Sequence, residues 1–442
     1  MRTTEFGKLD CGMTKKITFE HLVPNAMPGR FDGIHRPYTV ADVLRLRGAV
    51  PVRHSIAEHG ANRLWKLLGT WPSVHALGAS TSRQAVQMVG AGLKALYLSG
   101  QDHSEADAAD DAGPAKVGPE RVRRFNSALR RADQIEHADS AHGSGTHALG
   151  SARVESWFAP IVAEAGCGGS LESFEIMTAY IDAGAAGVHF DDRLPRDATH
   201  GHRNEAVLIP TGDHIRNLVA ARLAADIMGV PTVIIARADA ASAPLVTSGA
   251  DARDRAFIVP GVRTPEGFYA FQSGVDACIA RGLAYAPYAD ILWWETPTPN
   301  LKDAARFAEA IHRKFPGKIL AYNCSPSLHW TSRFDANSIA RFQREIGAMG
   351  YKFQFVTAAG LRHLTGGLRE LAGGFRDRGM AAYLELQQAD AAGEIRCDTA
   401  APLSRDFSRG YLEAVSAAIG GATSFAFTSE ATEAAQFQTA AE

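Results

Sequence analysis

Charged and histidine side chains follow two short apolar runs of this chain and occupy the loop between them. The runs span residues 187–190 and 234–236, and the polar residues after and between them are Asp191, Asp192, His200, His202 and Arg237. Carboxylate, imidazole and guanidinium groups at such spacing can transfer protons, hold a cation or bind an anionic substrate. The pattern therefore predicts a catalytic or binding site where these apolar segments end.

Polar residues also follow most of the other apolar runs, and their types predict what the site would bind. The residues at these ends are Ser99 with Gly100, Glu164, Asp191, Arg237, Glu295, Asn323 with Ser325 and Ser327, and Thr357. Arginine binds a carboxylate through two parallel hydrogen bonds, and amide and hydroxyl groups add shorter contacts. One such residue would carry little weight, and Arg237 by itself could instead form a buried ion pair. Together they favour a small polycarboxylate as ligand.

The elements that must position these residues are eight apolar runs that alternate with amphipathic stretches. The runs span residues 74–79, 95–98, 158–163, 187–190, 232–236, 291–294, 319–322 and 353–356. Most are continuously apolar, as expected for parallel strands that are covered on both faces. Eight such repeats favour an α/β fold of the (β/α)8 TIM-barrel type over an open doubly wound sheet. In that barrel the carboxyl ends of the strands meet at one rim, which would bring the polar residues together.

The chain divides by sequence into an N-terminal helical segment (1–70), a barrel (71–360) and a C-terminal helical segment (361–442). Amphipathic stretches predict helices at 40–46, 56–68, 121–135, 214–228, 301–315, 338–349 and 380–391. Two stretches, 102–116 and 137–150, are polar or rich in glycine and small residues, and predict loops. The helices that follow the barrel must bury their apolar faces somewhere, and a neighbouring subunit would supply a surface.

The composition is that of a soluble, enzyme-sized protein of 442 residues, with 46% hydrophobic and 21% charged residues. A formal charge of −2 gives no electrostatic reason to expect nucleic acid or an anionic membrane as partner. No apolar run approaches the roughly 18 residues that span a bilayer, and the first residues do not resemble a secretory signal. The five cysteines are odd in number and scattered, as in a reducing cytosol. We expect a cytoplasmic protein with neither a membrane nor a nucleic-acid partner.

Several longer segments, in their order along the chain, resemble the isocitrate lyase family. They span residues 91–100, 157–163, 186–192, 208–211, 222–226, 231–240, 282–290, 321–327 and 385–388, and include the motifs GVHFDD, AYNCSPS and ELQQ. The resemblance implies a (β/α)8 barrel and a homotetramer with exchanged C-terminal helices. It also implies retro-aldol cleavage of isocitrate to glyoxylate and succinate with Mg²⁺, the lyase reaction of the glyoxylate cycle.

The resemblance also implies a role for individual residues. The substrate site would comprise Ser99, Gly100, Arg237, Glu295, Asn323, Ser325, Ser327 and Thr357. His202 would support the catalytic loop, Glu295 would share in proton transfer, and Glu164 with Asp191 would be the carboxylates left to hold Mg²⁺. Mn²⁺ or another divalent ion is the alternative to Mg²⁺ at that place.

The catalytic loop departs from the family. The family motif is Lys-Lys-Cys-Gly-His, whereas residues 198–202 read Ala-Thr-His-Gly-His. His200 therefore stands where the family has the cysteine that protonates the succinate carbanion, and both lysines are absent. An imidazole, with an ordinary pKa of about 6.5, is suited to proton transfer near neutral pH. His200 could equally be a solvated loop histidine, so the catalytic set of His200, His202 and Glu295 remains a hypothesis.

The metal ligands depart from the family as well. Residues 162–166 are two residues shorter than the family segment and keep Glu164, while the principal Mg²⁺-binding aspartate is deleted. The family tryptophan after the Ser99-Gly100 pair is replaced by Gln101. A site formed by His200 and His202 with a carboxylate would instead suit Fe²⁺, Mn²⁺ or Zn²⁺.

Two functions remain open at this point. The retained substrate residues favour a carbon–carbon lyase that acts on a 2-hydroxy polycarboxylate such as isocitrate, with an altered catalytic loop. The combined absence of the cysteine, both lysines, the tryptophan and a metal ligand favours a catalytically impaired paralogue. Such a protein would bind carboxylates or co-assemble with an active lyase.

Overall fold

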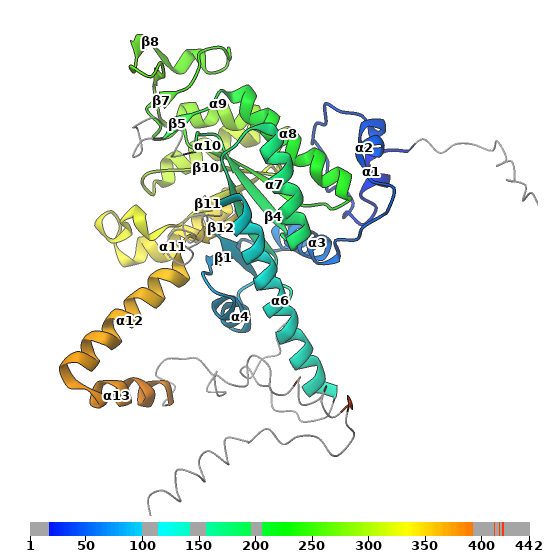
Figure 1. Cartoon of the computed structure of the whole chain (residues 1–442). Helices are drawn as coiled ribbons and strands as arrows, with labels where there is room; N and C mark the ends of the chain where they lie inside the picture. Colours follow the sequence, from blue (N-terminus) through cyan, green and yellow to red (C-terminus); the bar gives the residue numbers. More distant parts are fainter. Residues whose placement is uncertain are drawn as a thin grey trace, which may run out of the picture. The chain divides into compact units, whose positions relative to one another are not determined.

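The computed structural model describes residues 17–99, 114–141, 156–195 and 206–391, together with residues 411, 415, 418 and 419 (Figure 1). The predicted site residues Gly100, His200 and His202 lie outside the described residues. The chain divides into two compact units. The first comprises Met1–His75, Tyr97–Val122 and Pro160–Thr357, and the second comprises Ala76–Leu96, Arg123–Ala159 and Ala358–Glu442. The sequence-based boundaries at residues 70 and 360 stay a prediction.

Eight strands close into a barrel in the order β1-β12-β11-β10-β6-β4-β3-β2. Their bounds are β1 (Val74–Gly78), β2 (Ala95–Leu98), β3 (Ile161–Gly166), β4 (Gly187–Asp191), β6 (Val233–Ala238), β10 (Ile291–Trp294), β11 (Ile319–Asn323) and β12 (Tyr351–Val356). The successive pairs from β3 through β4, β6, β10 and β11 to β12 are parallel. The predicted (β/α)8 TIM-type barrel is therefore confirmed.

The strand bounds agree with the sequence to within a few residues, and β3 differs most. β3 begins at Ile161 rather than at Phe158, because Pro160 has no amide hydrogen with which to join a ladder. The strand also continues to Gly166, so Glu164 lies inside β3 and not after it. The ladder pairs Glu164 of β3 with His189 of β4, and the register shifts after this pair, between Glu164 and Gly166.

Helices connect most strands of the barrel, as the amphipathic stretches predict. In the first unit they are α7 (Ser170–Ala183), α8 (Thr211–Met228), α9 (Val275–Tyr285), α10 (Leu301–Lys314) and α11 (Ala336–Ala348). The helices α7 and α8 lie side by side along the barrel (Figure 1). The N-terminal helices are α1 (Phe19–Leu22), α2 (Val40–Leu46) and α3 (Ser55–Thr70).

The remaining helices are α4 (Ser82–Gly90), α6 (Pro114–Ala141), α12 (Ala359–Arg378) and α13 (Met380–Ala391). The helix α6 begins at Pro114 and continues to Ala141, so residues 114–116 and 137–141 of the two predicted loops are helical, and the rest of both predicted loops lies outside the described residues. Proline suits the first turn of a helix, and the alanine-rich residues after position 135 carry no helix breaker before Gly143.

A second sheet was not predicted. Its four short strands have the order β5-β7-β9-β8, with bounds β5 (Val207–Leu208), β7 (Leu245–Val246), β9 (Tyr269–Phe271) and β8 (Ile258–Arg263). The strands β5 and β7 have two residues each, which is too few for an alternating pattern to be recognised.

Four rings from four strands pack on one another inside the barrel. Tyr97 stacks on Phe355 with centroids 4.3 Å apart, and Trp293 meets Phe355 edge to face at 5.0 Å. His189 lies 5.0 Å from Trp293 and 5.8 Å from Tyr97. We call these four rings the aromatic layer. Each is at most 2% exposed, so the interior of the barrel is filled with side chains.

Among the described residues, no helix has both the length and the apolar character needed to cross a bilayer.

Candidate functional site

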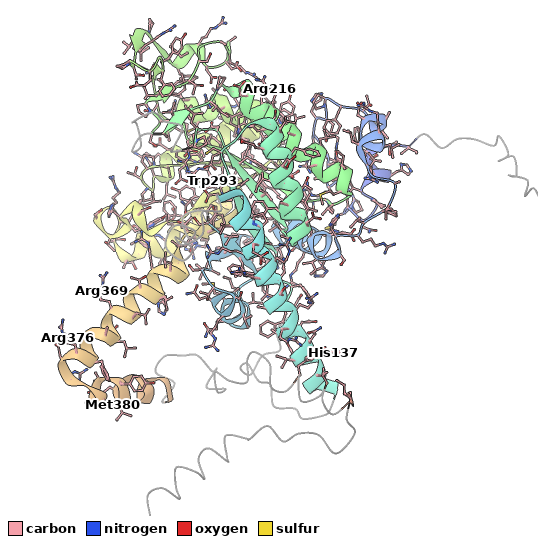
Figure 2. The ribbon with its side chains drawn as sticks, viewed as in Figure 1. His137, Arg216, Trp293, Arg369, Arg376 and Met380 are labelled. Carbon is pink, nitrogen blue, oxygen red and sulfur yellow. The ribbon has the colours of Figure 1, made fainter. Side chains whose placement is uncertain are left out.

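Asp191, Arg237 and Glu295 reach the same rim of the barrel from three neighbouring strands. Asp191 of β4 is level with Arg237 of β6, and Arg237 is level with Trp293 of β10, which is labelled in Figure 2. The amide of Glu295, directly after β10, donates to the Ala238 carbonyl at 2.9 Å. The parallel pairing of β4, β6 and β10 therefore places the guanidinium of Arg237 between the carboxylates of Asp191 and Glu295.

Arg237 binds two aspartates and lies over an aromatic ring. Its Nη2 donates to Asp239 Oδ1 at 2.7 Å, and its Nε lies 3.9 Å from Asp191 Oδ1. The guanidinium carbon is 4.4 Å from the centroid of the Trp293 ring. Burial works to lower the pKa of Arg237, but the charges of Asp191 and Asp239 outweigh burial and hold the pKa well above its ordinary value. The side chain is therefore a permanent cation, and it forms the ion pair that the sequence left open.

Asp191 is buried, and both of its carboxylate oxygens have partners. Oδ1 lies 3.2 Å from Nδ1 of His189, and Oδ2 accepts from Nη2 of Arg193 at 3.0 Å and from its Nε at 3.2 Å. Burial works to raise the pKa of Asp191, but the guanidinium groups of Arg237 and Arg193 together hold it well below its usual range. Asp191 is thus ionised across the physiological range.

Arg193 is a site residue that the sequence analysis missed. It lies two residues past Asp191, and its Nε is also 3.7 Å from Asp239 Oδ2. An isolated bridge from Arg193 to Leu208 holds its backbone. The spacing was the one signal that could have found it, because alternate residues of an extended segment point the same way.

Glu164 and Ser99 approach each other from β3 and from the end of β2. The hydroxyl of Ser99 donates to Glu164 Oε2 at 3.4 Å. The Glu164 backbone carbonyl accepts from the Tyr180 hydroxyl of α7 at 2.6 Å. A helix side chain therefore fixes the backbone of β3 at Glu164, beside the ladder position where the register shifts.

Glu164, His189 and Asp191 present ligand atoms within 4.8 Å of one another, which is close enough for one cation. The hydrogen-bond partners of His189 and Asp191 in this structure do not suit a bound cation. The ring of His189 is bound at Nε2 by the Tyr97 hydroxyl at 2.7 Å and at Nδ1 by Asp191, so neither nitrogen is open to a metal. Asp191 Oδ2 faces the Arg193 guanidinium. Mg²⁺ needs a nearly octahedral set of oxygens, and these described residues do not provide one as arranged.

Glu295 and Asn323 form a pair with unsatisfied polar atoms. Asn323 Nδ2 donates to Glu295 Oε1 at 3.3 Å. Glu295 Oε2 and Asn323 Oδ1 are buried, and neither has a hydrogen-bond partner among the described residues. Burial raises the pKa of Glu295 to about 7, with the charge of Arg237 opposing this rise. Buried polar atoms in this state point to a ligand or solvent that completes them.

Three hydroxyls form a third group next to Asn323 in the sequence. Ser325 Oγ lies 2.8 Å from Ser327 Oγ, and Thr357 Oγ1 donates to Ser325 Oγ at 3.2 Å. The short 3-10 helix Pro326–Leu328 and the Trp330 indole, which donates to the Ser325 carbonyl at 2.9 Å, hold the turn. Hydroxyls can donate or accept hydrogen bonds, so this group could bind the oxygens of a carboxylate.

The structure thus brings the described site residues into contacting groups at the strand ends. Direct contacts join Ser99 to Glu164, Arg237 to Asp191, Asn323 to Glu295, and Ser325 to Ser327 and Thr357. Besides Arg193, the residues missed by sequence reasoning are Tyr97, His189 and Asp239. Tyr97 and His189 lie inside apolar runs, where a polar residue gives no separate signal.

A family model and three similar proteins agree on one family. The model of the isocitrate lyase family matches residues 26–262 and 260–426. An isocitrate lyase of Halalkalibacterium halodurans is 51% identical over 92% of this chain and 95% of its own length. Isocitrate lyase 1 of Mycobacterium tuberculosis is 45% identical over the same shares, and an isocitrate lyase of Salmonella typhimurium is 44% identical over 96% of this chain and 100% of its own.

Among solved structures, oxaloacetate acetylhydrolase in complex with oxalate is 18% identical, with a TM-score of 0.48 over 76% of this chain and 97% of its own. The family match extends over most of the chain, and the three isocitrate lyases share 44–51% of their residues with it. This chain belongs to the isocitrate lyase family.

Proposed function

We propose that this protein is a carbon–carbon lyase that cleaves a 2-hydroxy polycarboxylate such as isocitrate into glyoxylate and succinate. Membership of the isocitrate lyase family supports the reaction class. The observation that carries the proposal is the Glu295–Asn323 pair, whose buried oxygens have no partner among the described residues next to the charged Arg237. Such a site is prepared for a polar, anionic ligand.

In this proposal two parts of the rim bind the two ends of the substrate. Arg237 binds the carboxylate beside the hydroxyl-bearing carbon and polarises that carbon for bond cleavage. The hydroxyls of Ser325, Ser327 and Thr357 bind a second carboxylate, which becomes part of succinate. Asn323, between the two parts, binds a substrate oxygen through its amide.

Cleavage requires one proton acceptor and one proton donor. The acceptor removes the proton of the substrate hydroxyl, that oxygen becomes the carbonyl of glyoxylate, and the adjacent carbon–carbon bond breaks. The electron pair of that bond stays on the succinate carbon until a donor protonates it. Glu295, with a pKa of about 7, suits the acceptor, and His200 of the catalytic loop is our proposed donor.

The test is turnover by the purified protein. Isocitrate, 2-methylisocitrate and oxaloacetate are each incubated with the protein with Mg²⁺, with Mn²⁺ and with EDTA, and glyoxylate and succinate are followed by NMR. We expect glyoxylate from isocitrate, and an H200Q variant that binds succinate like the wild type but turns over more slowly. No product from any of the three substrates would contradict the proposal.

A second candidate is a carboxylate-binding protein without turnover, including one that co-assembles with an active lyase. The Arg193–Asp191 ion pair favours it, because Arg193 binds the carboxylate of Asp191, which was expected to hold Mg²⁺. The departures of residues 198–202 from the family loop point the same way. Calorimetry separates the candidates: succinate binding without cleavage of any substrate favours the second.

We also propose that the protein is a cytoplasmic homotetramer. Large apolar side chains are exposed on α12 and α13, namely Leu368, Phe375, Met380, Tyr383 and Leu384. Met380 is labelled in Figure 2, together with Arg369 and Arg376 of α12. Apolar surface of this extent on paired helices suits burial against another subunit. Light scattering coupled to size-exclusion chromatography measures the state, and a monomer at micromolar concentration would contradict the proposal.

A further inference from the structure

Arg193 holds the carboxylate that a divalent cation would need. Its Nε and Nη2 both donate to Asp191 Oδ2, at 3.2 and 3.0 Å, so two donors of one guanidinium converge on a single carboxylate oxygen. The Arg193 side chain is 19% exposed and that of Asp191 is fully buried, so water screens the pair little. A cation that bound Asp191 would meet a fixed positive charge at short range.

The backbone around Arg193 is held by main-chain bonds. The amide of Leu194 donates to the Val207 carbonyl at 2.8 Å, and the amide of Ile209 donates to the Asp192 carbonyl at 3.0 Å. Arg193 itself bridges to Leu208. The guanidinium therefore extends from a fixed point of the chain and not from a free loop tip.

The other charges of the cluster fit the same arrangement. Asp191 and Asp239 face Arg193 and Arg237, so each of these two carboxylates has a guanidinium partner. Within the described residues, the hydrogen bonds of both arginines run through Nε and Nη2. The Nη1 groups of Arg193 and Arg237 are therefore the donors that remain for an anion. Both arginines contact the same two aspartates, Asp191 and Asp239.

We propose that in this protein the guanidinium of Arg193, and not a divalent cation, is the positive group held by Asp191, and that Arg193 and Arg237 bind a ligand carboxylate without metal. The inference rests on the proposed carboxylate site and adds a residue to it. It makes two statements that can be tested separately. Ligand binding does not require a divalent ion, and Arg193 excludes such an ion from Asp191.

The first experiment measures succinate binding to the full-length protein by calorimetry, in EDTA and in Mn²⁺. For the wild type we expect dissociation constants that agree within about threefold between the two conditions. In EDTA the R193Q variant should bind at least about tenfold more weakly, because a charged donor to the carboxylate is lost. R193K, which keeps the charge but loses the paired guanidinium donors, should lie between them.

The second experiment measures Mn²⁺ binding alone by electron paramagnetic resonance. R193Q should bind Mn²⁺ at least about tenfold more tightly than the wild type, because a positive charge beside Asp191 is removed. R216Q is the matched control. Arg216 pairs with Asp213 on the surface of α8, is 68% exposed and is labelled in Figure 2, so its loss should change neither binding constant.

The outcomes separate the inference from the proposed function. If the wild type binds succinate in Mn²⁺ but not in EDTA, the carboxylate site stands and the role of Arg193 is wrong. Equal Mn²⁺ affinities of wild type and R193Q overturn the exclusion of metal. If neither protein binds succinate under any condition, the proposed site and the inference both fail. Thermal unfolding of each variant checks that it is folded.

Discussion

The Asn323 side chain donates through Nδ2 to Glu295 Oε1 at 3.3 Å, while Glu295 Oε2 and Asn323 Oδ1 stay buried without a partner among the described residues. A protonated carboxyl and an ionised one need different partners, and the amide of Asn323 serves the ionised form. The raised pKa of Glu295 shows that burial outweighs this help. The pair therefore changes its charge within the physiological pH range.

Glu295 should make stability depend on pH. Its carboxyl titrates near 7 in the folded protein and near its ordinary value of about 4.3 when unfolded, so the folded state binds the extra proton between these values. The protonated group contributes stability that is present below pH 4.3 and lost as pH rises through 7. E295Q, which stays neutral, should match the wild type at pH 4 and melt at a higher temperature at pH 8. Equal melting temperatures at pH 8 would show that Glu295 is not buried in this way.

Glu295 should also set the pH profile of any turnover. As proton acceptor it must be ionised, so kcat/KM for isocitrate should rise as pH increases through about 7. E295Q should lose at least about 100-fold in kcat, the usual contribution of a general base, while binding succinate. E295D, which keeps the carboxyl, is the control that should retain part of the activity. A wild-type profile that is flat between pH 6 and 8 would count against this role.

Arg237 should contribute to both binding and stability. R237Q removes a cation between Asp191 and Asp239 and leaves two buried carboxylates with less compensation. We expect a loss of about 3 kcal/mol in the free energy of unfolding, typical of breaking a buried ion pair from one side. Succinate affinity should fall with it. Urea denaturation measures the first effect and calorimetry the second, with R216Q as the exposed control.

Asp290 should affect stability and leave the ligand site unchanged. It accepts from Arg30 at 2.6 Å, from Arg222 at 2.5 Å and from the amide of Ile234 at 2.7 Å, and thereby fixes the start of β6. D290A leaves two buried guanidinium groups without their shared carboxylate and should cost about 3–5 kcal/mol. If the variant folds at low temperature, it should still bind succinate with wild-type affinity. A selective loss of binding in a fully folded D290A protein would contradict this separation.

The three hydroxyls of Ser325, Ser327 and Thr357 should increase ligand affinity. S325A removes the hydroxyl that contacts both Ser327 and Thr357. In the proposed function this hydroxyl would bind substrate equally before and during the reaction, so KM should rise about tenfold with little change in kcat. T357S keeps the hydroxyl and is the matched control. A change in kcat alone would assign Ser325 to the chemical step.

The barrel and its polar rim could be predicted because both depend on local patterns. Continuous apolar runs such as 291–294 give strands, and the parallel order then places Glu295 near Arg237 without further information. The start of β3 was misjudged because Phe158 looks like a strand residue, whereas Pro160 prevents pairing before Ile161. The two-residue strands β5 and β7 pair with segments distant in the chain, so no local sequence pattern predicts them.

The electrostatics of the rim could be predicted only in part. The sequence placed Asp191 at the end of a strand, but it did not reveal that Arg193 binds it, because that pairing depends on side-chain direction after the strand. His189 looked like one residue of an apolar run, and its bonds to Tyr97 and Asp191 follow from packing inside the barrel. Partners that meet through three-dimensional packing leave no spacing signal in one sequence.

The aromatic layer also limits how the site exchanges with solvent. Tyr97, Trp293, Phe355 and His189 are at most 2% exposed and close the barrel below the rim, so there is no second opening through these rings. In the proposed lyase reaction, substrate would enter and both products would leave at the rim formed by the strand ends. A bulky first product that stays there would block the second, and the order of departure would then govern the overall rate.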